Sequence, residues 1–139
     1  MKASLILIAA LGTLALSGCG HLDTTPEGDP SRVLTGSVDL GAAAALPADA
    51  VVTVRVVEPQ RGGAPLRVLG SQTISHPGAS PVAFRVEYLA EDELLRHGLN
   101  VEARVSWGGR VRYYNMNGYA VTLGNAADPH RVVVNAVGQ

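Results

Sequence analysis

The chain is 139 residues long, which suits a single domain, and 47% of its residues are hydrophobic. Its 11 basic and 12 acidic residues give a formal charge of −1, and this balance excludes the electropositive surface of a nucleic-acid-binding protein. Aromatic residues make up only 4% of the chain, whereas valine and glycine are abundant, and this composition is typical of an all-β domain.

The first segment, residues 1–18, has the pattern of a signal peptide for export. Lys2 supplies a positive charge, and the apolar run from Ala3 to Leu16 is too short for a comfortable membrane span. The run Leu16-Ser17-Gly18-Cys19 fits the lipobox of bacterial lipoproteins. This resemblance implies cleavage between Gly18 and Cys19 and acylation of Cys19.

Cys19 is the only cysteine, so it has no disulfide partner in an oxidising compartment. Acylation of its thiol and amine removes that liability and anchors the protein stably. The alternative is an ordinary secretory signal that ends in cysteine. Gly20 follows Cys19 where an aspartate would retain such lipoproteins in the inner membrane. This sorting pattern favours the bacterial outer membrane, with the domain facing the periplasm.

A flexible tether is predicted over residues 19–30, because prolines, glycines and small polar residues fill it and Leu22 is its only large apolar residue. Loss of residues 1–18 removes Lys2 and no acidic residue. Ten basic residues then face twelve acidic ones, and the formal charge becomes −2.

The remaining residues, 31–139, are predicted to form one β-sandwich domain, because strand patterns recur there at short spacing. Val52, Val54 and Val56 share one face of the strongest strand, so Val57 is expected to face away from the core. Gly36 is interpreted as a possible bulge. Strands are expected over residues 33–40, 51–58, 67–75, 82–88, 99–107, 110–115, 119–123 and 131–137.

Residues 90–96 form the only helix-like stretch, with acidic residues early, an arginine late and Gly98 beyond its end as a C-terminal cap. Gly108-Gly109 predicts a two-residue hairpin turn. The sequence therefore predicts an all-β fold, a small antiparallel β-sandwich of seven to eight strands with one short helix, behind a lipoprotein signal peptide and a flexible tether.

Two stretches of this pattern resemble a known family. Residues 45–54 (ALPADAVVTV) and 82–88 (VAFRVEY) are similar to segments that read like "aLPpgAvvtV" and "ipFelpY" in the YbaY/YscW group of small bacterial lipoproteins. The resemblance covers about residues 35–123. Residues 113–119 stand where that family often carries a Thr-Asp-Thr stretch. The resemblance implies a β-sandwich without enzymatic chemistry. YscW-like members are pilotins, which escort secretin subunits of type III secretion to the outer membrane.

The residues give no pattern for catalysis or for a metal site. His21, His76, His97 and His130 lie far apart without metal-ligand spacing, and no Gly-x-Ser-x-Gly elbow occurs. We therefore predict that the protein is not an enzyme, and we assign no catalytic residue, metal, cofactor or small-molecule substrate.

Arginines alternate with apolar residues on several predicted strands, and two interpretations stay open. One is an outward charged face paired with Glu58, Glu87 and Glu102; the other is a partner-binding face. Tyrosine beside arginine is typical of interfaces, and Arg112 and Tyr114 are expected on one outward face. The predicted partner-binding residues are Arg110, Arg112, Tyr114, Met116 and Tyr119.

Three functions follow as hypotheses. The first is a non-catalytic outer-membrane lipoprotein that acts as a pilotin-like chaperone or assembly factor, and that binds the C-terminal segment of a secretin or another envelope polypeptide. The alternative is a YbaY-like structural envelope lipoprotein without a dedicated client. A small-ligand or hydrolytic enzyme is the third, and no constellation of residues supports it.

Overall fold

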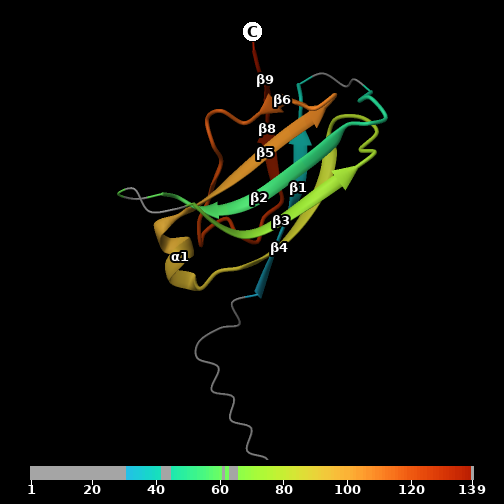
Figure 1. Cartoon of the computed structure of the whole chain (residues 1–139). Coiled ribbons are helices and arrows are strands. Elements are labelled where there is room, and N and C mark those ends of the chain that lie inside the picture. The colour runs from blue at the N-terminus through green and yellow to red at the C-terminus, as the bar shows by residue number, and fades with distance from the viewer. Residues whose placement is uncertain (1–30, 42–44, 61, 63–65, 139) are drawn as a thin grey trace, which may run out of the picture.

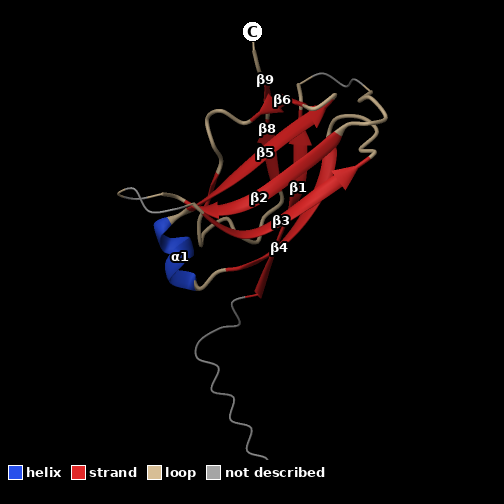
Figure 2. Ribbon diagram, viewed as in Figure 1, coloured by secondary structure: helices blue, strands red, loops and turns tan. Residues whose placement is uncertain are grey.

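The computed structural model describes residues 31–41, 45–60, 62 and 66–138 of the chain. Two β-sheets stack against each other, with one short helix beside one end of the stack (Figures 1 and 2). The elements are β1 (Ser31–Asp39), β2 (Val51–Glu58), β3 (Arg67–Ser75), β4 (Val82–Leu89), α1 (Asp92–His97), β5 (Leu99–Trp107), β6 (Arg110–Tyr114), β7 (Ala120–Val121), β8 (His130–Val133) and β9 (Asn135–Ala136). The all-β prediction is confirmed.

The larger sheet has the strand order β3-β2-β5-β6-β9, and β7 pairs with the start of β5. All its pairings are antiparallel. The predicted bounds of β2, β3 and β5 are confirmed to the residue, because strict alternation and clear turn residues delimit these strands. Gly108 and Gly109 join β5 to β6 with φ angles of 63° and 76°, as a two-residue hairpin turn requires.

The smaller sheet has the order β4-β1-β8, and it departs from the purely antiparallel prediction. β1 and β8 run parallel, with Gly36 opposite His130. The expected last strand, 131–137, is divided between the sheets: β8 pairs with β1, whereas β9 pairs with β6. Val134, 2% exposed, lies at the crossing, and its N–H donates to the carbonyl of Asp39 at 3.0 Å.

The core lies between the two sheets, where each contributes alternate residues of its strands. β4 buries Val82, Phe84, Val86 and Tyr88, and β5 buries every second residue from Leu99 to Val105, as the alternation predicts. α1 adds Leu95, which is fully buried, and Gly98 ends the helix with a φ of 92°. Leu94 also packs against the core, so this short helix is held by two apolar side chains and a glycine cap.

Gly36 does not form a bulge, and this corrects the sequence prediction. The β1–β4 ladder runs without a shift from Ser31 to Val38. A Cβ atom on Gly36 would lie 2.0 Å from the carbonyl oxygen of His130. The glycine therefore allows β8 to approach β1 closely.

Val57 is buried, and this corrects the expectation that it faces away from the core. Only 1% of Val57 is exposed, and its neighbour Val56 is also fully buried. Successive side chains of a strand point to opposite faces, so the burial of both is unexpected. The β2–β3 register shifts between these two residues, because Leu69 is an extra residue in β3. Val57 lies in a central strand, flanked by Val68 on one side and Asn100 on the other. The bulge in β3 thus lies beside two consecutive buried valines of β2, Val56 and Val57.

Candidate functional site

The five predicted partner-binding residues lie on or just after β6, but a bulge divides them. Ser106 pairs with Val111 and Val105 pairs with Tyr113, so Arg112 is an extra residue in β6. The Arg112 guanidinium lies 5.3 Å from the centroid of the Trp107 ring, and its Nε donates to the Trp107 carbonyl at 3.2 Å. Trp107 packs against the core, so Arg112 turns toward the core-facing side of the sheet.

Tyr114 lies on the other side of the sheet, opposite Arg104. The Arg104 guanidinium lies 6.0 Å from the centroid of the Tyr114 ring. Arg112 and Tyr114 therefore do not share one outward face, because the extra residue in β6 reverses the alternation between them. This corrects the expectation from strict strand periodicity.

Tyr119 is bound into the fold. Its hydroxyl group and Nδ1 of His130 are 2.9 Å apart, and the two rings meet edge to face at 5.4 Å. Its backbone N–H donates to Oδ1 of Asn100, and its carbonyl accepts from Val101, both at 2.8 Å. Only Arg110 and Met116 of the predicted set are strongly exposed. A role of these residues in binding stays a prediction.

His130 is a buried titratable group that the sequence did not single out. It is 3% exposed, and burial lowers its pKa, while the carbonyls of Ala126 and Asn125 and the charge of Asp128 oppose this effect. Its position directly after Pro129, at the start of an alternating strand, is the signal that would have placed it inward.

Arg55, Arg67 and Arg85 follow the charged-face interpretation, whereas Arg104 and Arg112 lie against aromatic rings. Arg55 pairs with Glu102, Arg67 lies 3.2 Å from Glu58, and Arg85 lies 2.8 Å from Glu87. The three acidic residues named from the sequence are therefore each paired with an arginine. The exposed pair of Arg85 and Glu87 contributes little to stability, whereas the pair of Arg55 and Glu102 is partly buried. Their charges are neutralised within the protein.

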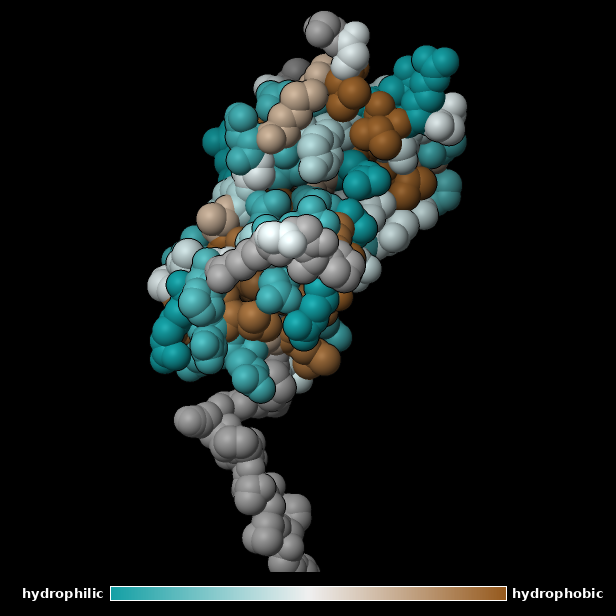
Figure 3. Space-filling model, turned by 60° about the vertical axis from the view of Figure 1, so that its left-hand side comes forward, coloured by the Kyte–Doolittle hydropathy of each residue, from teal (hydrophilic) through white to brown (hydrophobic). Residues whose placement is uncertain are grey.

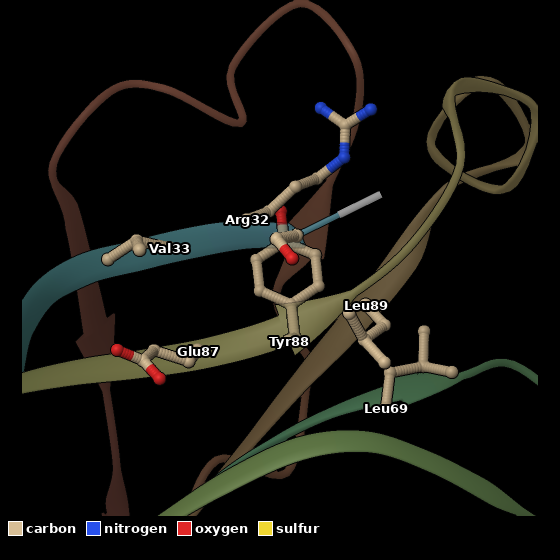
Figure 4. Close-up of a pocket in the computed structure, with 7 residues that line it drawn as sticks. Arg32, Val33, Leu69, Glu87, Tyr88 and Leu89 are labelled. Carbon is tan, nitrogen blue, oxygen red and sulfur yellow. The ribbon is translucent and has the colours of Figure 1, made fainter. Parts of the chain in front are cut away.

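A pocket of about 490 Å³ opens where β3 meets β4, and sequence reasoning did not predict it. Its lining comes from the start of β1, the end of β4 and Leu69 of β3 (Figure 4). Leu89 is 60% exposed and Val33 is 41% exposed. We call Val33, Leu69, Tyr88 and Leu89, with the space between them, the β1/β4 pocket. The alternation of β4, which buries Tyr88, is the signal that places Leu89 outward.

Tyr88 is a buried polar residue of the β1/β4 pocket, which Ser31, Arg32 and Glu87 also line. The residue is 2% exposed, and its hydroxyl has no hydrogen-bond partner among the described residues. Burial raises the pKa of Tyr88, and the nearby positive charge of Arg32 opposes this effect. In Figure 4 the Tyr88 ring points toward β1 and Arg32. Arg32 itself donates from Nε to the Ala90 carbonyl at 2.6 Å and pairs with Asp92 of α1.

The described residues contain no group of three or more His, Cys, Asp or Glu side chains that could hold a metal ion. Within the same residues, no helix is long and apolar enough to cross a membrane. Cys19, Gly18 and His21 lie outside the part of the chain that the structure describes.

The fold is that of a small β-sandwich whose described surface carries paired charges and the β1/β4 pocket, and comparison with known proteins assigns its family. The family model of the type III secretion system lipoprotein chaperone (YscW) matches residues 29–134, so the chain belongs to this family. The family resemblance predicted from the sequence is thereby confirmed.

A solved structure agrees with this assignment. The chain is similar to an alternative pilotin from the type II secretion system of Vibrio cholerae, with 26% sequence identity and a TM-score of 0.65. The match covers 78% of this chain and 99% of that one. A search of curated proteins gave no match.

Proposed function

We propose that the protein is a lipid-anchored, non-catalytic chaperone that binds a secretin subunit and escorts it to the outer membrane. The single observation that carries this proposal is the family match, because residues 29–134 include nearly all of the folded domain. The similarity to a pilotin of another secretion system supports the same role.

The anchor in this proposal is Cys19, acylated after removal of residues 1–18. β1 begins at Ser31, so residues 19–30 connect the lipid to the domain. A chain of that length spans at most about 40 Å when fully extended. The domain is then held close to the periplasmic face of the outer membrane, where a secretin has to assemble.

The proposed client is the C-terminal segment of a secretin, bound by surface contacts without chemistry on the client. The second candidate, a YbaY-like structural lipoprotein without a dedicated client, has the same fold and anchor. The two differ only in whether a specific polypeptide binds.

Titration calorimetry distinguishes them. The mature chain, residues 19–139 with Cys19→Ser so that no acylation occurs, is titrated with a synthetic peptide of the secretin C-terminus from the same secretion system. We expect saturable binding, and none with a peptide of the same composition in scrambled order. Absence of binding to both peptides would favour the structural lipoprotein.

A further inference from the structure

Four exposed apolar side chains lie at one end of the domain, in and beside the β1/β4 pocket. Val33 and Leu89 of the β1/β4 pocket are exposed, and Leu66 and Val68 continue the exposed apolar surface along the start of β3. Figure 3 shows apolar surface on this side of the molecule, in the lower half of the domain. Exposed apolar side chains gathered in this way mark interaction sites more often than single ones do.

The pocket arises from the way in which the two sheets meet. β3 and β4 are edge strands of different sheets, and Gly70 lies against β4, since its Cβ would lie 2.2 Å from the carbonyl oxygen of Glu87. The side chain of Gln72 accepts a hydrogen bond from the N–H of Arg85 at 2.7 Å. Beyond these contacts, toward Leu69 and Leu89, the pocket opens. It is therefore part of the fold and not a gap between mobile side chains.

The charges around the pocket identify the chemistry of its occupant. Arg32 pairs with Asp92, Arg85 pairs with Glu87, and Arg67 of β3 pairs with Glu58. The two charged residues that line the pocket, Arg32 and Glu87, are therefore both paired, and neither offers a free charge to an ionic ligand. The buried Tyr88 hydroxyl, which lacks a hydrogen-bond partner, favours an occupant that carries hydrogen-bonding groups beside its apolar ones. A polypeptide segment combines both, whereas a plain acyl chain has only apolar groups along its length.

We infer that the β1/β4 pocket is the docking site for an uncharged, apolar segment of the client polypeptide, whose side chains pack between Val33, Leu69 and Leu89 and whose backbone reaches the hydroxyl of Tyr88. This inference rests on the proposed function. Ser31, the first described residue, lines the pocket, so the client is held at the end of the domain where the lipid tether joins. The site differs from the β6 residues predicted from the sequence.

Matched variants test the site. In the mature chain with Cys19→Ser, Val33→Ser and Leu89→Ser should each weaken binding of the secretin C-terminal peptide at least tenfold, as loss of a central apolar contact does. The controls are Val111→Ser and Leu123→Ser, whose wild-type residues are both 40% exposed on other parts of the surface. We expect less than a twofold change for either. Circular dichroism should show all four variants folded, because the replaced side chains are exposed.

Tyr88→Phe tests the polar contact. The variant removes a hydroxyl that is buried without a partner, so the free domain should be at least as stable as the wild type. Binding of the peptide should nevertheless weaken roughly three- to tenfold, because the hydrogen bond to the client is lost. A structural role alone would not lower affinity while stability is kept. Equal affinity of Tyr88→Phe and the wild type would remove the hydroxyl contact from the inference.

Nuclear magnetic resonance with ¹⁵N-labelled protein separates this inference from the proposed function. Peptide-induced shifts at Val33, Leu69 and Leu89 support it. Binding with shifts at Tyr114 and Met116, and unchanged affinity of Leu89→Ser, would overturn the docking site and leave the chaperone function standing. Shifts at the pocket that palmitate causes and the peptide does not would overturn the docking site in favour of an acyl chain. Shifts there that depend on protein concentration alone would overturn it in favour of a second copy of the chain. No binding of the peptide at all would overturn both proposals.

Discussion

At the scale of single residues, His130 has consequences beyond packing. It lies against the backbone of Gly36, and its ring meets Tyr119, so it joins β8 to β1 and to the segment before β7. Replacement of all four histidines would therefore also disturb packing, and it would not test for catalysis alone. His76, whose Nδ1 lies 2.9 Å from the carbonyl of Ala48, and the exposed His97 are the informative positions for that test.

The stability of the domain should depend on pH through His130. Burial lowers its folded-state pKa below the ordinary value of about 6.5, so the unfolded chain binds the proton more readily. The contribution of neutral His130 to stability is then present above about pH 6.5 and is lost as the pH falls below it. Urea unfolding at pH 7.5 and at pH 5 should show a loss at the lower pH.

His130→Gln is the matching variant, and His97→Gln is its control. We expect His130→Gln to be less stable at pH 7.5 by about 1–3 kcal/mol, because the partly buried hydrogen bond between the Tyr119 hydroxyl and the buried His130 ring is lost. Its stability should fall less between pH 7.5 and pH 5 than that of the wild type, whereas His97→Gln should follow the wild type. An equal fall in both variants would assign the acid sensitivity to other groups.

At the scale of the elements, the strands that the sequence predicted well are those with local signals. β2, β3 and β5 show alternation between clear turns, and their bounds follow from residues that are neighbours in the chain. Two bulges were missed, at Leu69 and Arg112, because an inserted residue carries no compositional mark. The parallel pairing of β1 with β8 was missed because the partner of an edge strand is chosen by contacts distant in sequence.

The bulge at Leu69 changes what is expected for substitutions in β2. Val54→Asp should unfold the domain, since a buried unpaired carboxylate costs several kcal/mol against a total stability of roughly 5–15 kcal/mol. Val57→Asp should now be about as damaging, because Val57 is as deeply buried as Val54. Thr53→Asp, on the half-buried outward side of the same strand, should remain folded. Urea unfolding followed by circular dichroism measures the order, and a mild effect at Val57 would contradict the burial.

At the scale of the whole molecule, the sequence did not predict which residues form the candidate site. The aromatic and basic residues of β6 stand out in the sequence, but Arg112 and Tyr119 are engaged within the fold. The β1/β4 pocket combines the start of β1 with the consecutive strands β3 and β4, and none of these strands is unusual alone. The pocket and the start of β1 lie at the end of the domain that also carries α1, and β9 lies at the opposite end (Figure 1). An anchor at Cys19 would therefore join the domain at the end that carries the pocket, not at the end that carries β9.

The anchor itself gives the last prediction. Cys19→Ser should leave the protein uncleaved or soluble, because serine cannot form the thioether that precedes lipoprotein processing. Labelling of cells with radioactive palmitate, followed by separation of inner and outer membranes, measures both steps.

Gly20→Asp is the matched control: it keeps the thiol, so it should still be labelled, but by the sorting pattern of bacterial lipoproteins it should move to the inner membrane. Secretin assembly should fail in both variants, because the client is then carried to the wrong place or not carried at all. Palmitate labelling and outer-membrane fractionation of Cys19→Ser would show that the lipobox interpretation is wrong.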